Sequence, residues 1–233
     1  MSVAIVIPTY NEVNNIKKLI DQIFSINKNL NVIVVDDNSP DGTAKAVNVL
    51  KKRHIKLSLI KRKGKGGRGS AVVEGFKHVY KNRDIKLFIE MDADFSHRPE
   101  EIKKLVEKSK KFDVVIGSRY LKNSKIFGWS IGRKVFSKIA NLYCRLVLGV
   151  PISDYTNGFR CYSKRTAKKL ISANFKSKGY ILLSEIAYFL HRQGYSFGEV
   201  PTVFRNRVRG KSNFSLSEVK ESLIAIPRIK LNY

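Results

Sequence analysis

The sequence predicts a single α/β domain with a mostly parallel central sheet. Short apolar runs of strand length alternate with segments of helical periodicity, several runs end in polar clusters, and no repeat or linker interrupts the chain. A chain of 233 residues is long enough to bury one sizeable core. In a parallel sheet, polar turns that follow the strands meet at one edge, which is where such folds bind ligands.

The first half of the chain supplies most of the predicted sheet. The expected strands are Val3–Ile7, Val32–Val35, Leu57–Ile60, Leu87–Met91 and Val114–Ile116. Apolar residues recur three or four apart between them, which predicts helices at Ile16–Phe24, Thr43–Lys52, Ala71–Tyr80 and Ile102–Lys108.

The second half has a different character. Residues Ile126–Val150 combine apolar positions at helical spacing with interleaved Lys and Arg. A polar loop at Asp154–Arg160 follows, and further elements are expected at Arg165–Ala173 (helix), Ile181–His191 (helix), Phe197–Phe204 (strand) and Leu216–Ile229 (amphipathic helix).

The charge balance points to an anionic partner. Lys and Arg number 45 against 19 acidic residues, a formal net charge of +26. Nucleic acid, an acidic membrane and a phosphorylated substrate would all suit this charge. No helix-turn-helix, zinc knuckle or RNP-type motif occurs, so no specific nucleic acid is expected.

Several features favour a cytoplasmic location. Cys144 and Cys161 have no metal or redox spacing and are expected to be free thiols. No apolar stretch of about 18 residues is present, so no transmembrane helix is expected. The first residues form a strand pattern in place of a signal peptide.

Asp92-Ala93-Asp94 directly follows the apolar run Leu87–Met91. At a strand end, where the chain turns, both carboxylates can reach toward one cation. Mg²⁺ and Mn²⁺ prefer hard oxygen ligands and often complete their shell with water and phosphates. A chance pair of aspartates in a solvated turn is the alternative, but the position after a buried strand favours a metal site.

Other acidic and glycine-rich clusters follow strands. Asp36-Asp37 ends the second apolar run, and a carboxylate there can accept hydrogen bonds from a ribose or a base. Asp41 or Thr43 is expected to cap the next helix. Gly64–Gly69 contains G-x-G-x-x-G, but it follows the third strand, so a basic loop near phosphates is expected in place of a dinucleotide site.

An ordered series of motifs resembles glycosyltransferase family 2, specifically the polyprenol (dolichol) monophosphate mannose synthases. Any single motif is modest, but the ordered series is specific and spans nearly the whole chain. The motifs are Pro8–Glu12, Asp36–Thr43, Asp92–Pro99, Gly117–Tyr120, Trp129 with Arg133 and Ser137, Asp154–Arg160, Gly194-Tyr195, Glu199–Pro201 and Arg207–Ser212.

The resemblance implies a GT-A (nucleotide-sugar-binding, Rossmann-like) fold with a basic amphipathic acceptor-side extension. Residues 1–120 would form the nucleotide-sugar and metal half, and residues 121–233 the acceptor half and tail of one domain, 1–233. The resemblance also implies the inverting transfer of a hexose onto a polyprenyl or dolichyl phosphate. The favoured hexose is mannose, with GDP-mannose as the donor. One departure concerns Asn213, where relatives commonly have Lys, and Lys211 is a candidate substitute.

Residue roles follow from the same resemblance. The expected metal ligands for Mg²⁺ or Mn²⁺ are Asp92, Asp94 and Ser96. The expected nucleotide-sugar contacts are Pro8, Tyr10, Glu12, Asp37, Asp92, Ala93, Asp94, Arg207 and Lys211. The expected acceptor-phosphate contacts are Arg119, Arg133 and Ser137. Asp94, Arg119, Arg133 and Arg207 would form the catalytic set. A phosphate nucleophile is already anionic, so no strong general base is required.

A peripheral position on the cytoplasmic face of a membrane is expected, with an anchoring partner protein as a further possibility. We expect Phe127 and Trp129, in the segment Ile126–Ile131, to contact the headgroup region, while the helix beyond Val135 faces either lipid or the core. The alternatives are a UDP-glucose-dependent dolichyl-phosphate glucosyltransferase or another polyprenyl-phosphate hexosyltransferase. An alternative from a different class is a basic protein that binds nucleic acid or a membrane and has no catalytic activity.

Overall fold

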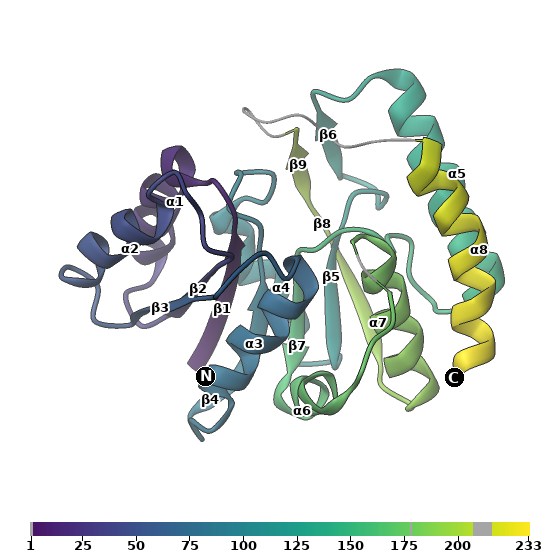
Figure 1. Ribbon diagram of the computed structural model, residues 1–233. Coiled ribbons are helices and arrows are strands. Elements are labelled where there is room, and N and C mark those ends of the chain that lie inside the picture. The colour runs from purple at the N-terminus through teal and green to yellow at the C-terminus, as the bar shows by residue number, and fades with distance from the viewer. Residues whose placement is uncertain (1, 178, 207–215) are drawn as a thin grey trace.

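The computed structural model describes residues 2–177, 179–206 and 216–233, and it confirms the predicted α/β class (Figure 1). In this part of the chain a seven-stranded sheet has the order β3-β2-β1-β4-β7-β5-β8. Its strands are β1 (Ser2–Thr9), β2 (Asn31–Asp36), β3 (Leu57–Lys61), β4 (Ile85–Glu90), β5 (Val114–Ser118), β7 (Arg160–Ser163) and β8 (Phe197–Pro201).

All pairings in this sheet are parallel except those of β7, which runs antiparallel between β4 and β5. β7 is not predicted from the sequence, and its first residue, Arg160, falls in the expected loop Asp154–Arg160. The strand has only four residues and begins with a fully buried Arg160, whose charge hides the strand pattern. The Arg160 guanidinium donates to the carbonyls of Tyr155, Asn157 and Leu183, which explains how it is accommodated in the core.

Helices cover both faces of the sheet. One face packs against α1 (Val13–Ile26), α2 (Thr43–Lys51) and α4 (Ile102–Lys108), which follows the short helix η1 (Pro99–Glu101). The other face packs against α3 (Arg68–Tyr80), α6 (Lys164–Ser172) and α7 (Ile181–Arg192). Two apolar cores, one on each face, result from strands that are buried on both sides.

The predicted strand Phe197–Phe204 is two strands in the structure. β8 pairs with β5, whereas β9 (Val203–Arg205) leaves the main sheet and pairs with β6 (Lys125–Phe127). The break falls at the buried Thr202, whose hydroxyl donates to Glu101 Oε2 at 2.5 Å and whose N–H donates to Ser118 O. These bonds to two different elements redirect the chain.

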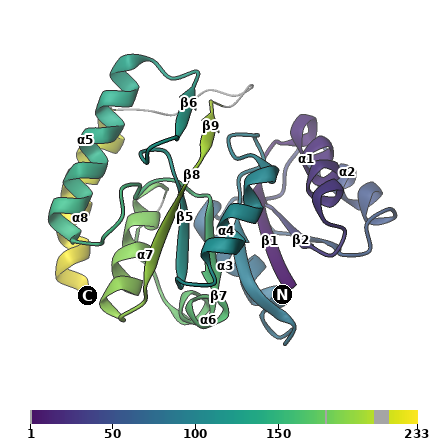
Figure 2. The same ribbon diagram turned by 180° about the vertical axis from the view of Figure 1, so that it is seen from behind.

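The stretch Ile126–Val150 divides into β6 and the long helix α5 (Ile131–Leu148). Gly128 adopts φ +78° between them, and Ser130 caps the helix by accepting from the Arg133 N–H. The last helix, α8 (Leu216–Asn232), packs beside α5 at the end of the molecule opposite α1 and α2 (Figures 1 and 2).

Candidate active site

The ends of β1, β2 and β4 form one edge of the sheet, where the strand order reverses between β1 and β4. Each of these strands is followed by a non-glycine residue in the left-handed region: Asn11 at φ +61°, Asn38 at +59° and Phe95 at +60°. Asparagine tolerates this conformation, but a bulky residue such as Phe adopts it at a cost. Such strain concentrates at functional turns, and here it lies at Phe95, directly after Asp94.

Pro8 lies where β1 and β4 separate at this edge of the sheet. Pairing between β1 and β4 stops at Val6 and Glu90, so Pro8 pairs only with β2. Proline is tolerated at that position because no strand lies on its other side to require its missing N–H. The two strand ends therefore diverge at the point where open α/β sheets bind nucleotides.

The Asp92–Asp94 turn is mostly enclosed. Asp94 is 8% exposed and its Oδ1 accepts from the Ser96 N–H at 3.0 Å, while Ser96 and Ala93 are buried. The Asp92 side chain is about a third exposed, at 31%. Asp94 is thus held by the turn itself, and Asp92 is the more accessible of the two carboxylates.

Arg68, the first residue of α3, links the turn to two other elements. Its Nε donates to Asp92 Oδ1 at 2.7 Å, its Nη1 to Glu90 Oε2 at 2.6 Å and its Nη2 to the Gly158 carbonyl at 3.0 Å. Burial acts to lower the pKa of Arg68, but Asp92 and Glu90 raise it above its ordinary value. A Cβ added at Gly158 would lie 2.1 Å from Arg68 Nη2, so a side chain there would force the guanidinium to shift.

Glu90 and Arg68 are functional candidates that the sequence analysis missed. Glu90 was treated only as a strand residue, and Arg68 only as part of the Gly64–Gly69 loop. Glu90 is 2% exposed and also accepts from the Tyr162 hydroxyl at 2.6 Å. A carboxylate inside an otherwise apolar strand was the available signal, since a buried charge requires a partner.

His97 is fully buried beneath the same turn. Its Nδ1 accepts from the Asp92 N–H at 3.2 Å, so its Nε2 carries the proton and donates to Asn157 Oδ1 at 2.8 Å. Asn157 Nδ2 in turn donates to the Gly117 carbonyl. This chain of bonds connects the acidic turn to the loop Asp154–Arg160.

The donor groups of this turn fit a hard divalent ion. Across residues 2–177, 179–206 and 216–233, no three or more His, Cys, Asp or Glu side chains gather as a metal-binding cluster. Mg²⁺ bound together with phosphates commonly uses only one or two protein carboxylates. Asp92 and Asp94, with Ser96 beside them, therefore suit an ion that takes its remaining ligands from a diphosphate.

Asp37, which is expected near the nucleoside, accepts hydrogen bonds from other residues of the chain. Its Oδ1 accepts from Arg62 Nη1 at 2.6 Å, and its Oδ2 accepts from the N–H groups of Gly66 and Gly67 at 3.1 and 2.9 Å. The glycine-rich loop thus folds over a carboxylate. Asp36 is a purely structural neighbour that accepts from Thr9 and Ser39.

Tyr10 and Glu12 lie beside this loop at the start of α1. Tyr10 is exposed, and Lys65 Nζ lies 4.5 Å from the centroid of its ring. Glu12 occupies the N-cap position of α1, and its N–H donates to Thr43 Oγ1 at 2.9 Å. The predicted cap of α2, Asp41 or Thr43, is wrong, because Gly42 occupies the N-cap position. Asp41 accepts instead from the N–H groups of Val13 and Thr43, which links the starts of α1 and α2.

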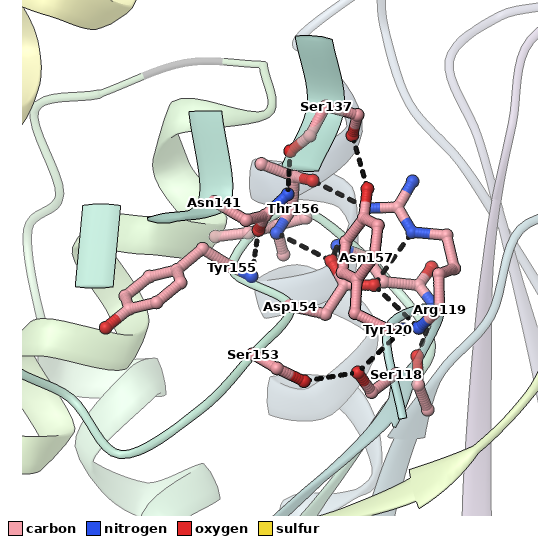
Figure 3. A network of polar contacts seen from close by, with 12 residues as sticks. Ser118, Arg119, Tyr120, Ser137, Asn141, Ser153, Asp154, Tyr155, Thr156 and Asn157 are labelled. Carbon is pink, nitrogen blue, oxygen red and sulfur yellow. Dashed lines mark hydrogen bonds and ion pairs between the residues drawn. The ribbon is translucent and has the colours of Figure 1, made fainter. Parts of the chain in front are cut away.

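The second group of site residues centres on a buried ion pair between Arg119 and Asp154 (Figure 3). Arg119 Nε and Nη2 donate to the two carboxylate oxygens at 2.8 and 2.7 Å, and Nη2 also donates to Thr156 Oγ1. Burial acts to raise the pKa of Asp154, but Arg119 lowers it below its ordinary value, so the pair stays charged. In the described residues Nη1 of Arg119 makes no hydrogen bond.

Trp129 brings Arg119 and Arg133 together. The guanidinium carbons of Arg119 and Arg133 lie 5.3 and 4.3 Å from its ring centroids. The indole also packs on Phe204 of β9, and its Nε1 is buried without a hydrogen-bond partner in the described part of the chain. The half-buried ring is a shared platform for two cations, and the expected headgroup contact of Trp129 stays a prediction.

Ser137 lies one turn further along α5 than Arg133. Its hydroxyl is 2.5 Å from that of Tyr120, which follows Arg119 in sequence (Figure 3). The structure thus brings Arg119, Arg133 and Ser137 into one region, as the acceptor-site prediction requires. Arg207 and Lys211, and the departure at Asn213, lie outside the described residues.

Comparisons with known proteins agree with this fold and site. The family model for glycosyl transferase family 2 matches residues 4–171. The polyprenol monophosphomannose synthase of Mycolicibacterium smegmatis is 34% identical over 95% of this chain and 84% of its own length. The undecaprenyl-phosphate mannosyltransferase of Micrococcus luteus is 33% identical over 98% and 93%. The chain belongs to glycosyl transferase family 2 and is a glycosyltransferase.

Solved structures show the same fold at low identity. Mannosyl-3-phosphoglycerate synthase from Rubrobacter xylanophilus superposes with a TM-score of 0.71 at 18% identity, over 100% of this chain and 74% of that one. Glucosyl-3-phosphoglycerate synthase from Mycobacterium tuberculosis, in complex with Mn²⁺, UDP and glucosyl-3-phosphoglycerate, gives 0.67 at 20% over 99% and 79%. A mannosyltransferase from Pyrobaculum calidifontis in complex with GDP-Man and Mn²⁺ gives 0.64 at 18% over 90% and 58%. The predicted GT-A fold is confirmed.

Proposed function

We propose that this glycosyltransferase transfers a mannosyl residue from GDP-mannose to a polyprenyl phosphate such as dolichyl phosphate, with inversion at the sugar carbon. One geometric observation carries the proposal. The loop Asp154–Arg160 contacts both halves of the site, because Asn157 binds His97 under the acidic turn and Asp154 binds Arg119. This loop links the region proposed to bind the donor diphosphate to the region proposed to bind the acceptor phosphate, which supports the proposal.

The relatives support the choice of sugar and acceptor. Two proteins that match nearly the whole chain are named for mannosyl transfer to polyprenol and undecaprenyl phosphate. The neighbour from Pyrobaculum calidifontis, bound to GDP-Man and Mn²⁺, supports the choice of donor. UDP-glucose remains the competing donor, since the neighbour from Mycobacterium tuberculosis holds UDP.

The chemistry follows from the two regions. An oxygen of the acceptor phosphate attacks the anomeric carbon, the bond from that carbon to the diphosphate breaks, and GDP leaves with the electron pair. The nucleophile is already anionic, so the residues need only to position it and to stabilise the charge on the leaving group. Arg133, together with Nη1 of Arg119, would hold the acceptor phosphate, with Ser137 beside them.

The donor would be held at the edge formed by β1, β2 and β4. Asp92 and Asp94, with Ser96, would hold Mg²⁺ or Mn²⁺, which when bound neutralises charge on the diphosphate. Pro8, Tyr10, Glu12 and Asp37 would surround the nucleoside, with Ala93 beside the diphosphate. Arg207 and Lys211 would add positive charge, and Asp94, Arg119, Arg133 and Arg207 would form the catalytic set.

A polyprenyl acceptor resides in a bilayer, so we propose that the chain works at the cytoplasmic face of a membrane. None of the described helices is long and apolar enough to cross a bilayer. In this proposal the lipid is reached at the membrane surface, by the chain itself or with an anchoring partner.

The test is a donor panel. The protein is incubated with dolichyl phosphate, Mn²⁺ and labelled GDP-mannose, UDP-glucose or UDP-N-acetylglucosamine in turn. Label extracted with the lipid from GDP-mannose alone is the expected result. Label from UDP-glucose alone would overturn the donor assignment, and absence of lipid-soluble label from every donor would overturn the proposed function. Calorimetric titration of GDP with and without Mn²⁺ tests the metal separately from turnover.

A further inference from the structure

The segment between β3 and α3 carries cationic side chains that lie on the proposed donor site. The pairs that they form there are Arg62 with Asp37, Lys65 with Tyr10 and Arg68 with Asp92. The last of these pairs involves the acidic turn that is proposed to hold Mg²⁺ or Mn²⁺. A cation bonded at 2.7 Å to a carboxylate that is expected to bind a second cation requires a physical explanation.

Three hydrogen bonds fix the Arg68 guanidinium relative to three different parts of the fold. Asp92 lies in the acidic turn, Glu90 lies at the end of β4, and Gly158 lies in the loop that reaches the acceptor side. The Arg68 side chain is 26% exposed, so it lies between the core and the open edge of the sheet. A planar guanidinium that donates in three directions has little freedom to rotate, so it holds the Asp92 oxygen in place.

Glu90 cancels the charge of Arg68. It is 2% exposed, lies two residues before Asp92 and accepts hydrogen bonds from Arg68 and from the Tyr162 hydroxyl. Because the charges of this pair sum to zero, the acidic turn keeps the two negative charges of Asp92 and Asp94 for a divalent ion. An arginine without such a counter-ion would repel the cation that the turn is proposed to bind.

Asp92 is held at two points by residues that are not among the expected metal ligands. Arg68 Nε donates to its Oδ1, and its own N–H donates to His97 Nδ1. A carboxylate can accept a hydrogen bond with one oxygen and bind a metal with the other. Residues that hold a metal ligand in this way orient it, and their loss commonly lowers metal affinity by roughly ten- to hundredfold.

We propose that Arg68 is a positioning residue for the divalent ion, which holds Asp92 by Oδ1 and so presents the carboxylate to the ion. Glu90 makes this arrangement possible, because it offsets the repulsion between Arg68 and the ion. The inference rests on the proposed function for the presence of a metal at the acidic turn, but not for the identity of the sugar or the acceptor. The opposite reading is that Arg68 occupies the place of the ion and competes with it, and the two readings predict effects of opposite sign.

The direct test is a titration of the protein with Mn²⁺ in the presence of GDP and, in a parallel series, of UDP, with free Mn²⁺ followed by electron paramagnetic resonance. Arg68→Leu/Glu90→Gln removes one charge of each sign, so the net charge of the site is unchanged. This double variant is expected to bind Mn²⁺ about tenfold more weakly, because Asp92 loses its hydrogen bond. The matched control is Arg165→Leu/Asp113→Asn, which removes an ion pair of equal charge from outside the site and should bind Mn²⁺ like the unmodified protein.

Gly158→Ala tests the orientation of Arg68 without changing any charge. An added Cβ would meet the guanidinium, which must then shift while Asp92 and Glu90 stay intact. Binding of Mn²⁺ should weaken about threefold. Gly132→Ala on α5 is the matched control, because among the described residues no neighbouring atom lies within 4 Å of a Cβ added there. Thermal unfolding of every variant establishes that it is folded at the temperature of the titration.

Three results would overturn the proposal. Tighter binding of Mn²⁺ by Arg68→Leu/Glu90→Gln would show that Arg68 competes with the ion. Binding equal to that of the control pair would show that Arg68 and Glu90 only stabilise the fold. Absence of Mn²⁺ binding by the unmodified protein with either nucleotide would remove the metal on which the inference depends.

Steady-state kinetics separate this inference from the proposed function. In Arg68→Leu/Glu90→Gln the Mn²⁺ concentration that gives half of the maximal rate should rise about tenfold, while the KM for dolichyl phosphate stays unchanged. Saturating Mn²⁺ should restore most of kcat, which a general loss of folding would not allow. Mn²⁺ binding that depends on Arg68, without sugar transfer from any donor, would refute the proposed function and leave the role of Arg68 intact. Mannosyl transfer with equal Mn²⁺ binding in the variant and its control would do the reverse.

Discussion

The two regions of the site handle charge in opposite ways. At the donor edge, acidic groups are neutralised by arginines of the chain itself: Asp37 by Arg62, and Glu90 and Asp92 by Arg68. At the acceptor side, Arg119 is neutralised by Asp154, but its face and that of Arg133 stack on Trp129. Aromatic stacking helps to position a guanidinium without using its N–H donors. In the described residues Nη1 of Arg119 makes no hydrogen bond, and we propose that it serves a phosphate.

This difference suggests how each region meets its ligand. In the proposed mechanism the donor edge presents carboxylates to an incoming cation, although one oxygen of Asp92 is already bonded to Arg68. The acceptor side would present cations to an incoming anion. The following variants test that contrast, in order of decreasing expected effect.

Asp94→Ala is expected to lower the rate of mannosyl transfer at least about a hundredfold, because an enclosed carboxylate of the donor edge is lost where diphosphate charge must be stabilised. The measurement is lipid-extractable label from GDP-mannose. The exposed Asp84→Ala serves as the matched control and should leave the rate unchanged. Full activity of Asp94→Ala, or of the unmodified protein in excess chelator, would contradict the metal assignment.

Arg68→Leu is expected to lower the free energy of unfolding by about 3 kcal/mol, because it leaves the buried Glu90 without its counter-ion. Urea denaturation measures the change. The double variant Arg68→Leu/Glu90→Gln should recover most of the loss, since the unpaired charge is then removed. A single variant that unfolds at the same urea concentration as the unmodified protein would show that Arg68 is not needed to hold this edge together.

Arg133→Ala is expected to raise the KM for the lipid phosphate about tenfold, with little change in the KM for the donor. The reason is that Arg133, whose guanidinium lies 4.3 Å from the Trp129 ring centroid, is proposed to hold the acceptor phosphate. Steady-state kinetics with each substrate varied in turn measure both constants, and Arg53→Ala on the exposed surface is the control. A comparable loss of donor binding would break the proposed division between the two regions.

Asp113 belongs to neither region and provides a reference. Burial acts to raise its pKa, but hydrogen bonds from Arg165 and Ser196 lower the pKa to about 2. A carboxyl whose folded pKa is depressed stabilises the protein above its unfolded pKa of about 3.9, and this stabilisation is lost as the pH falls toward 2.

Asp113→Asn should therefore cost about 1 kcal/mol at neutral pH and flatten the decline in stability below about pH 4. Thermal unfolding across pH 2–7 measures the effect, and both KM values should stay unchanged. An altered KM would mean that the pair is coupled to the site and is no neutral reference.

Local patterns predicted much of the sheet but not its complete order. The apolar runs at β1 to β5 and the helical spacing of α1 to α4 are local properties, so their existence and type were predicted, with ends displaced by a few residues. β7 was missed because it is short and begins with Arg160. The break at Thr202 was missed because it depends on Glu101, which is distant in sequence.

The candidate site was predicted as a set of positions and not as a set of contacts. The motif series located the acidic turn and the Arg119, Arg133 and Ser137 group. It did not predict that Trp129 joins Arg119 to Arg133 or that Arg68 holds Asp92. Trp129 lies outside the motif that contains Arg119, and Arg68 lies outside the motif that contains Asp92.

The sequence by itself determined the α/β class, the edge of the sheet that carries polar turns, and membership of glycosyl transferase family 2. Periodicity and ordered motifs are properties of the linear chain, and they require no knowledge of packing. Only the tertiary structure decided which arginine pairs with which carboxylate and which side of α5 remains exposed. Partners such as Arg68 and Gly158 are separated by 90 residues, and burial of a helix side depends on what packs against it.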